Sequence, residues 1–91
     1  MLWIGEWDWD DGNLDELARH GLDWFVVLQV AEEHPKFRAN RKRRAASHQM
    51  IGPDRGGRHW TVCIVRLHGE RWRAVTGWSS TAGERAWYEG A

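Results

Sequence analysis

The sequence contains few of the residues on which several classes of small protein depend. Cys63 is the single cysteine among 91 residues, so no disulfide framework is present and the chain suits a reducing compartment. No signal peptide and no apolar run of transmembrane length can be recognised, and we therefore predict a soluble cytoplasmic protein without a membrane partner. The glycine motifs that bind nucleotide phosphates are also missing.

Spacings typical of metal ligands are absent as well. The five histidines and Cys63 form neither a Cys-x-x-Cys nor a His-x₃₋₅-His pattern, so we predict no metal site and no cofactor. Cys63 lies in the middle of an apolar segment, and a buried thiol of this kind is usually unreactive. Chemistry performed by this chain would therefore depend on His, Tyr, Arg and Lys side chains.

The large apolar side chains are mostly tryptophans, eight of them against two Phe and one Tyr. Each buried Trp removes about 200 Å² from water, so a few can form a core in a short chain. We interpret most of them as core and edge packing rather than as ligand-stacking surfaces. The length favours one domain spanning residues 1–91.

The formal net charge of zero conceals an uneven distribution along the chain. Residues 1–33 contain nine Asp or Glu and one Arg, a net charge of −8, whereas residues 34–91 contain twelve Lys or Arg and four acids, a net charge of +8. This asymmetry indicates a basic face suited to nucleic acid or phosphate. Equally, the two halves could pack together and compensate each other's charge.

Three strands in the second half form the most secure structural prediction. Residues 46–52, 59–67 and 71–78 read as strands. The turn Pro53-Asp54-Arg55-Gly56-Gly57 precedes the second of them, and the turn His68-Gly69-Glu70 precedes the third. The middle segment is apolar on both alternating sets, which is typical of a strand buried on both faces. In the third, Trp72, Ala74, Thr76 and Trp78 fall on one face and Arg71, Arg73 and Val75 on the other.

Helices are predicted on either side of this meander. Apolar spacing favours helices at about residues 13–20 and 24–33, the first ended by Gly21. On the second, Trp24, Val27, Leu28 and Ala31, widened by Phe25 and Val30, would face the sheet. Thr81 and Glu84 have the spacing of a capping box that opens a C-terminal helix. With short strands at residues 2–7 and 36–40, we predict an α+β fold: an antiparallel sheet of four to five strands with two N-terminal helices and a C-terminal helix against one face.

Four consecutive cations, residues 41–44, must lie in an exposed loop or strand end. Such a run is either a solvated loop or a contact for nucleic acid or a partner. With two preceding cations it forms the candidate RNA-binding set: Lys36, Arg38, Arg41, Lys42, Arg43 and Arg44.

The residues that remain suit the cleavage of RNA by its own 2′-hydroxyl. That reaction needs positive charge at the phosphorane-like transition state, a group that takes the 2′ proton and a group that protonates the leaving oxygen. Arginine supplies the charge through its forked donors, and His or Tyr can move the protons. The candidates are Arg58, Arg66, Arg71, Arg73, Arg85, His48, His59 and Tyr88, although each arginine alone is more simply a solvated strand residue.

Three ordered blocks resemble a known family. They are Trp9-Asp10-Asp11 with Asn13 and Arg19-His20-Gly21-Leu22; Ile51-Gly52 with Gly57-Arg58 before an apolar strand; and Arg73-Ala74-Val75-Thr76-Gly77-Trp78 with Glu84, Arg85 and Tyr88. Together they are similar to the BrnT ribonuclease toxins of type II toxin–antitoxin systems. The resemblance implies a RelE-like fold, RNA cleavage with or without the ribosome, and neutralisation by a BrnA-type ribbon-helix-helix antitoxin; a homodimer is compatible with it.

The resemblance also assigns residues. By matched position, Arg58, Arg73, Glu84, Arg85 and Tyr88 correspond to family residues; His20 matches too, but its place at a helix end favours a structural role. Where the family carries an arginine in its "SAR" segment, this sequence has Trp78, so either another arginine compensates or the nuclease is slow or inactive.

We therefore predict a catalytic set of Arg58, Arg73, Arg85, Tyr88 and His48, in which Arg58 and Arg73 hold the scissile phosphate. The alternative is a non-catalytic RelE-like module that binds nucleic acid or protein.

Overall fold

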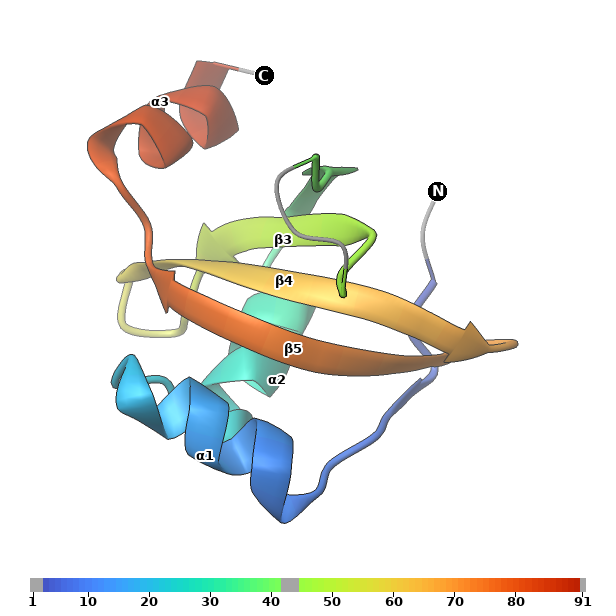
Figure 1. Cartoon of the computed structure of the whole chain (residues 1–91). Coiled ribbons are helices and arrows are strands. Elements are labelled where there is room, and N and C mark those ends of the chain that lie inside the picture. The colour runs from blue at the N-terminus through green and yellow to red at the C-terminus, as the bar shows by residue number, and fades with distance from the viewer. Residues whose placement is uncertain (1–2, 42–44, 91) are drawn as a thin grey trace.

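A five-stranded sheet flanked by three helices forms the computed structural model, which describes residues 3–41 and 45–90 (Figure 1). The strands are β1 (Glu6–Trp7), β2 (Lys36–Ala39), β3 (His48–Pro53), β4 (His59–His68) and β5 (Arg71–Ser79); the helices are α1 (Asp11–Arg19), α2 (Trp24–Glu32) and α3 (Ala82–Gly90). The predicted α+β fold is confirmed, with its five strands, two N-terminal helices and C-terminal helix. Within the described ranges, no helix has the length and apolar character that crossing a bilayer requires.

The sheet has the strand order β1-β5-β4-β3-β2. The pairs from β2 to β5 are antiparallel, as the sequence predicts, but β1 runs parallel to β5, so the sheet is mixed. β1 pairs at Glu6↔Arg71 and Trp7↔Trp72 and then leaves the sheet. Beyond that point the Asn13 side chain donates to the Ala74 carbonyl (3.1 Å), so α1 satisfies the edge of β5 that β1 leaves open.

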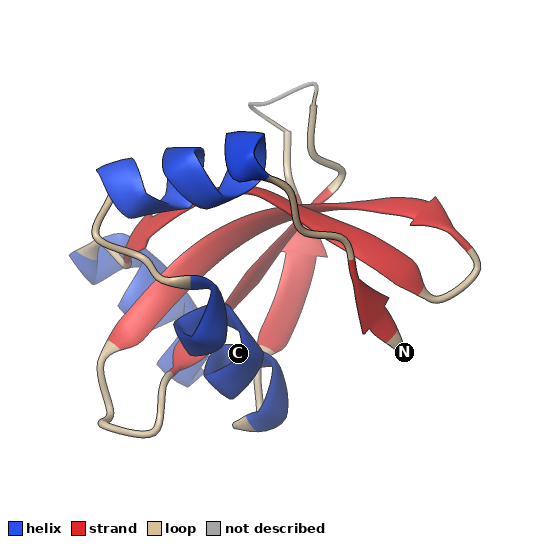
Figure 2. Cartoon of the chain, turned by 90° about the horizontal axis from the view of Figure 1, so that it is seen from below, coloured by secondary structure: helices blue, strands red, loops and turns tan. Residues whose placement is uncertain are grey.

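The helices lie on both faces of the sheet. Figure 2, seen from below, shows α1 and α2 in front of the sheet and α3 behind it. The core lies between the sheet and the first two helices, where Leu17, Leu22, Val27 and Val30 pack against strand residues such as Val62. The sequence predicts all three helices on one face of the sheet. This prediction is wrong for α3, which packs against β3 from the opposite face.

A bulge in β5 explains why one face of this strand differs from its sequence pattern. Ile64 pairs with Ala74 and Cys63 pairs with Thr76, which leaves Val75 as an extra residue. Trp72 lies before the bulge and is buried in the core, as predicted. Trp78 lies beyond it, and its indole N–H donates to Glu84 of α3 on the other face (3.0 Å).

The first two helices follow the sequence signals for their ends and for their buried faces only in part. Asp10 caps α1 in a reciprocal capping box with Asn13, and Gly21 adopts the left-handed conformation (φ 74°) that ends it. On α2, Val27 and Val30 are buried as predicted. Trp24 does not face the sheet: it is 47% exposed, and its ring packs edge-on against Trp9 at 6.4 Å.

A close contact in the core gives a test of this packing. A Cβ on Gly77 would lie 2.6 Å from Leu22 Cδ2 and 3.0 Å from the Thr61 carbonyl oxygen. Because Leu22 is fully buried, Gly77→Ala should lower the free energy of unfolding by about 1–3 kcal/mol, measured by urea denaturation. Gly83→Ala on exposed α3, whose Cβ meets nothing closer than 3.9 Å, is the matched control and should not destabilise the protein. Equal stability of the two variants would contradict the packing described here.

Candidate functional site

An aromatic and basic cluster lies where α3 packs over β2 and the beginning of β4. The Tyr88 and His59 rings meet edge to face at 5.3 Å between centroids. The Lys36 ammonium lies 5.0 Å from the centre of the Tyr88 ring and donates to the Tyr88 carbonyl oxygen at 2.6 Å. We call Lys36, His59 and Tyr88 the Tyr88 cluster. Its members come from three different elements, so only the fold brings them together.

The position of α3 depends on interactions at its first turn. The Thr81 and Glu84 side chains each accept from the other's backbone N–H, at 3.1 and 2.8 Å, so the predicted capping box is confirmed. The Glu84 carboxylate also accepts from the Trp78 indole N–H. Trp78 therefore helps to hold α3 against the sheet.

Tyr88 can approach the sheet closely because of Gly52 on β3. A Cβ on Gly52 would lie 3.1 Å from Pro35 Cα and 3.5 Å from Tyr88 Cε1, so a larger residue would push these segments apart. The Tyr88 hydroxyl donates to the His34 carbonyl oxygen at 2.7 Å. His34 itself has a left-handed backbone (φ 51°), which is uncommon for a residue other than glycine.

Positive charge continues from the Tyr88 cluster along β2. The Arg38 guanidinium stacks over the Trp87 ring at 4.8 Å, and its Nε donates to Gln49 Oε1 at 2.8 Å. Arg85 is exposed on α3. The ion pairs within the described residues use Arg19, Arg55, Arg71 and Arg73, together with His20, and none of them neutralises Arg38 or Arg85. This surface therefore retains the charge that a phosphate backbone requires.

Arg58 lies near the cluster but its side chain is directed elsewhere. Its guanidinium stacks over Trp60 at 4.5 Å, and Trp60 belongs to the core on the face of α1 and α2. The turn is held by Asp54, whose carboxylate accepts from Trp60 Nε1 (3.0 Å) and from the Arg58 backbone N–H (3.1 Å). Burial raises the pKa of Asp54, but these hydrogen bonds outweigh burial and hold that pKa below its usual range.

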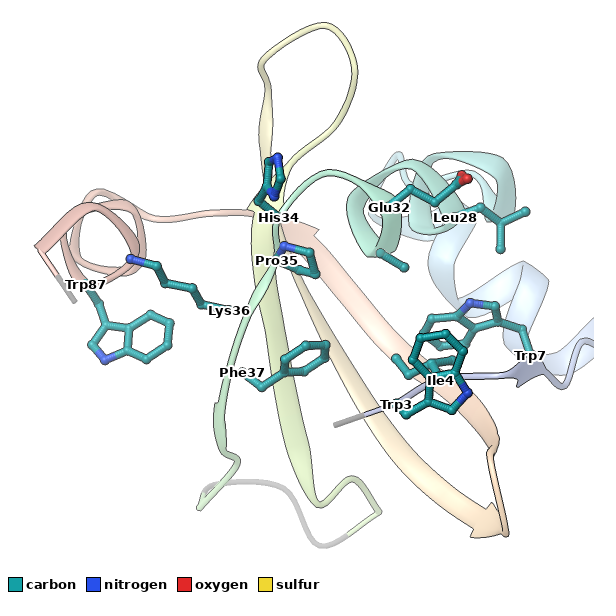
Figure 3. A pocket seen from close by; sticks show the side chains of 11 residues that line it. Trp3, Ile4, Trp7, Leu28, Glu32, His34, Pro35, Lys36, Phe37 and Trp87 are labelled. Carbon is teal, nitrogen blue, oxygen red and sulfur yellow. The ribbon is translucent and has the colours of Figure 1, made fainter. Parts of the chain in front are cut away.

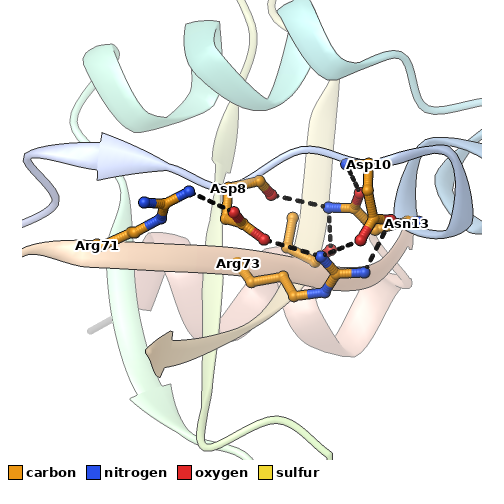
Figure 4. A network of polar contacts seen from close by, with 6 residues as sticks. Asp8, Asp10, Asn13, Arg71 and Arg73 are labelled. Carbon is orange, nitrogen blue, oxygen red and sulfur yellow. Dashed lines mark hydrogen bonds and ion pairs between the residues drawn. The ribbon is translucent and has the colours of Figure 1, made fainter. Parts of the chain in front are cut away.

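Arg73, the other predicted phosphate ligand, is bound by carboxylates. Its Nη1 contacts Asp8 Oδ2 at 3.0 Å and Asp10 Oδ2 at 2.8 Å, and its Nη2 contacts Asp10 Oδ1 at 3.0 Å (Figure 4). Arg71 binds the second oxygen of Asp8 at 2.6 Å. We call these four residues the Asp8–Arg73 network. It neutralises Arg73 and occupies both of its terminal nitrogens, so Arg73 does not face an open phosphate site.

The Asp8–Arg73 network makes stability depend on pH in the acidic range. The bidentate hydrogen bonds from Arg73 lower the pKa of Asp10 from 3.8 to about 2, and hydrogen bonds from Arg71 lower the pKa of Asp8. The native carboxylates thus stay ionised where the unfolded ones bind protons. The stability they contribute is complete above the unfolded pKa and is lost as pH falls through the folded pKa.

We therefore expect the urea midpoint to fall between pH of about 3.8 and 2, and the fall to be smaller in Arg73→Gln. Arg19→Gln, which breaks an exposed pair with Glu16, is the control and should keep most of the pH dependence. An identical acid profile for Arg73→Gln and the wild type would show that the network does not stabilise the fold.

The other predicted site residues do not join the cluster. His48 lies at the far end of β3 from Gly52, and its ring packs at 5.5 Å against the buried Trp72 ring. Its Nδ1 shares a hydrogen bond with Ser47 Oγ at 2.8 Å. Arg41 is exposed, whereas Lys42, Arg43 and Arg44 lie outside the described residues. No three His, Cys, Asp or Glu side chains of residues 3–41 and 45–90 come together as metal ligands.

Neither a protein-family model nor a curated protein matches this sequence. The similarity to BrnT toxins therefore depends on the three blocks of residues described above. His59 is one of the proton-transfer candidates in the sequence, but the predicted catalytic set does not contain it. Trp87, as the stacking partner of Arg38, was missed, because a pattern of residues does not show which ring a distant guanidinium covers.

Proposed function

We propose that this protein is a metal-independent endoribonuclease of the toxin type, with the Tyr88 cluster as its catalytic site. The observation that carries the proposal is the contact of His59 with Tyr88 beside the Lys36 ammonium. The predicted set is revised accordingly: Tyr88 and the RNA-binding Lys36 stay at the centre, His59 replaces His48, and Arg73 is assigned to stability.

The three side chains supply the groups that RNA cleavage needs. His59 takes the proton of the 2′-hydroxyl, whose oxygen then bonds to phosphorus while the bond from phosphorus to the 5′ oxygen breaks. Lys36 stabilises the additional negative charge on the phosphorane. Tyr88 gives its proton to the leaving 5′ oxygen; afterwards His59 releases its proton to solvent and Tyr88 regains one. The products are a 2′,3′-cyclic phosphate and a 5′-hydroxyl, and no metal takes part.

Basic residues beside the cluster would hold the RNA strand. Arg38 stacks on Trp87 of α3, Arg85 is an exposed residue of the same helix, and Arg41 follows β2. Trp87 offers its ring for stacking, and stacking tolerates any base sequence. Arg58, a predicted phosphate ligand, is left out of this path because its guanidinium stacks over Trp60 on the face of α1 and α2. With residues 42–44 next in the chain, this set supports a path for the RNA backbone along β2.

The partners implied by the resemblance belong to the same proposal. A toxin of this type would be neutralised in the cytoplasm by a BrnA-type ribbon-helix-helix antitoxin, and a homodimer remains compatible with the fold. The Asp8–Arg73 network favours a second candidate function, RNA binding without cleavage, because a predicted catalytic arginine is neutralised.

The proposal is tested with purified protein and a 5′-labelled RNA in the presence of EDTA. We expect cleavage that EDTA does not reduce and fragments that end in a 2′,3′-cyclic phosphate. Salt-dependent RNA binding without fragments would favour the second candidate. If the protein neither binds nor cleaves the RNA, both candidate functions are overturned. An inducible-expression experiment that follows growth and total RNA gives an independent readout in cells.

A further inference from the structure

β2 ends the sheet with one edge that no other described strand occupies. The Asn40 backbone N–H donates to the Ser47 carbonyl on the β3 side at 3.0 Å. Because backbone groups alternate between the two edges of a strand, those of Arg38 and Lys36 also point to β3. The N–H and C=O groups of Phe37 and Ala39 therefore point outward, where they can pair with an additional strand.

An apolar groove of about 1160 Å³ runs beside this edge, on the α2 side of the sheet (Figure 3). Phe37 of β2 points into it, toward side chains of α2 and of the N-terminal segment. Its apolar lining on this side includes Trp3, Trp7, Leu28, Pro35 and Phe37, and Lys36 and Trp87 line it from the α3 side of β2. Trp3 is 66% exposed, so a large apolar surface is open to a ligand.

Positive charge lies on the opposite side of the same strand. Lys36 and Arg38 alternate with Phe37 and contact the rings of Tyr88 and Trp87 on α3. An added strand would alternate in the same way, so every second side chain would enter the groove and the others would lie beside the two cations.

We propose that β2 binds an extended segment of a partner protein by strand addition, and that this segment alternates apolar and acidic residues. The backbone of Phe37 and Ala39 supplies the hydrogen bonds, the groove accepts the apolar side chains, and Lys36 and Arg38 pair with the acidic ones. This interface shares Lys36 and Arg38 with the proposed RNA site, so partner and RNA would compete for them, but strand addition does not depend on RNA cleavage.

The charges favour such a partner over a second copy of this chain. In an antiparallel pair of two β2 strands, Lys36 and Arg38 of one copy would lie opposite the same cations of the other, and like charges directly opposite are destabilising. RNA does not suit this groove, because the groove is lined by apolar side chains and by the acidic Glu32.

The test uses short synthetic peptides that alternate leucine and glutamate, with binding followed by amide-resolved NMR of the whole chain. We expect binding that protects the Phe37 and Ala39 amides from exchange, and weaker binding of a peptide with lysine in place of glutamate. Two further peptides carry N-methyl groups, one on the leucine amides and the other on the glutamate amides. Only one edge of the peptide faces β2, so one of the two should lose affinity by about tenfold or more.

The orientation follows from which peptide fails. In antiparallel addition the residues opposite Phe37 and Ala39 are leucines and donate to β2, so methylation of the leucine amides blocks binding; in parallel addition the glutamate amides donate instead. Equal affinity of both N-methylated peptides would overturn strand addition.

Two variants test the protein side of the interface. Ala39→Pro removes an outward N–H and leaves the hydrogen bonds between β2 and β3 intact. The protein should therefore stay folded, and its affinity for the leucine–glutamate peptide should fall by about tenfold. Arg38→Glu should reverse the preference toward the lysine peptide. Unchanged peptide affinity in both variants would overturn the proposal. It would also be overturned if the wild-type protein formed a dimer that Ala39→Pro dissociates, because β2 would then bind a second copy of the chain.

Discussion

Replacing His59 with alanine should reduce the rate of RNA cleavage by about 10²–10⁴-fold, the usual contribution of a general base. His59 is half-buried at the beginning of β4, where its ring contacts Tyr88, so the substitution leaves the core untouched. RNA binding should change little, because Arg38 and Arg85 remain. The measurement is single-turnover cleavage of a labelled RNA at several pH values, beside a binding curve.

His68→Ala is the matched control, since His68 is exposed at the β4–β5 hairpin, at the opposite end of β4. It should cleave at the wild-type rate. Tyr88→Phe keeps the ring against His59 but removes the hydroxyl, so it should bind RNA and cleave slowly. If His59→Ala and His68→Ala cleave equally fast, the Tyr88 cluster is not the catalytic site.

The largest effect on stability is expected from Trp72→Ala. Trp72 is 1% exposed and is the largest fully buried side chain among the described residues. Its truncation should cost about 3–5 kcal/mol. Small domains have about 5–15 kcal/mol of stability in total, so the variant should be close to unfolding at 37 °C. Urea denaturation followed by far-UV circular dichroism measures the difference.

Trp72→Phe separates the packing of the ring from its polar group. The indole Nε1 of Trp72 is buried and has no hydrogen-bond partner within the described residues. Phenylalanine removes this unsatisfied N–H, whose burial costs free energy, and leaves a smaller cavity than alanine. Trp72→Phe should therefore destabilise the protein much less than Trp72→Ala. Equal losses in the two variants would show that ring packing is not the source of the effect.

The parts of the fold that local signals determine were predictable from the sequence. The apolar run of β4 and its flanking turns predicted the meander, and the Thr81–Glu84 spacing predicted the beginning of α3. Such signals act over a few residues, so their physical cause is visible in a short segment.

The face chosen by a helix and the partners of a charge were less predictable. The side of the sheet covered by α3 is determined by the hydrogen bonds of Glu84 with Trp78 and of Tyr88 with His34, and the latter joins residues 54 positions apart. Arg73 reads as a free cation in the sequence, yet its partners are 63 and 65 residues away. The Val75 bulge also lacks a local signal, because it follows from register with β4.

The pairing of β1 with β5 has a consequence for the order in which the chain can fold during synthesis. Trp7 pairs with Trp72, and Asp8 binds Arg71, so the segment around β1 can pair only after β5, more than 60 residues later, has been made. Likewise α1 and α2 cover strands that follow them in the chain. Contacts of such long sequence separation form slowly, since a large loop must close first. During synthesis the tryptophan-rich segment from Trp3 to Trp24 therefore stays exposed, and the sheet closes only after β5 has left the ribosome.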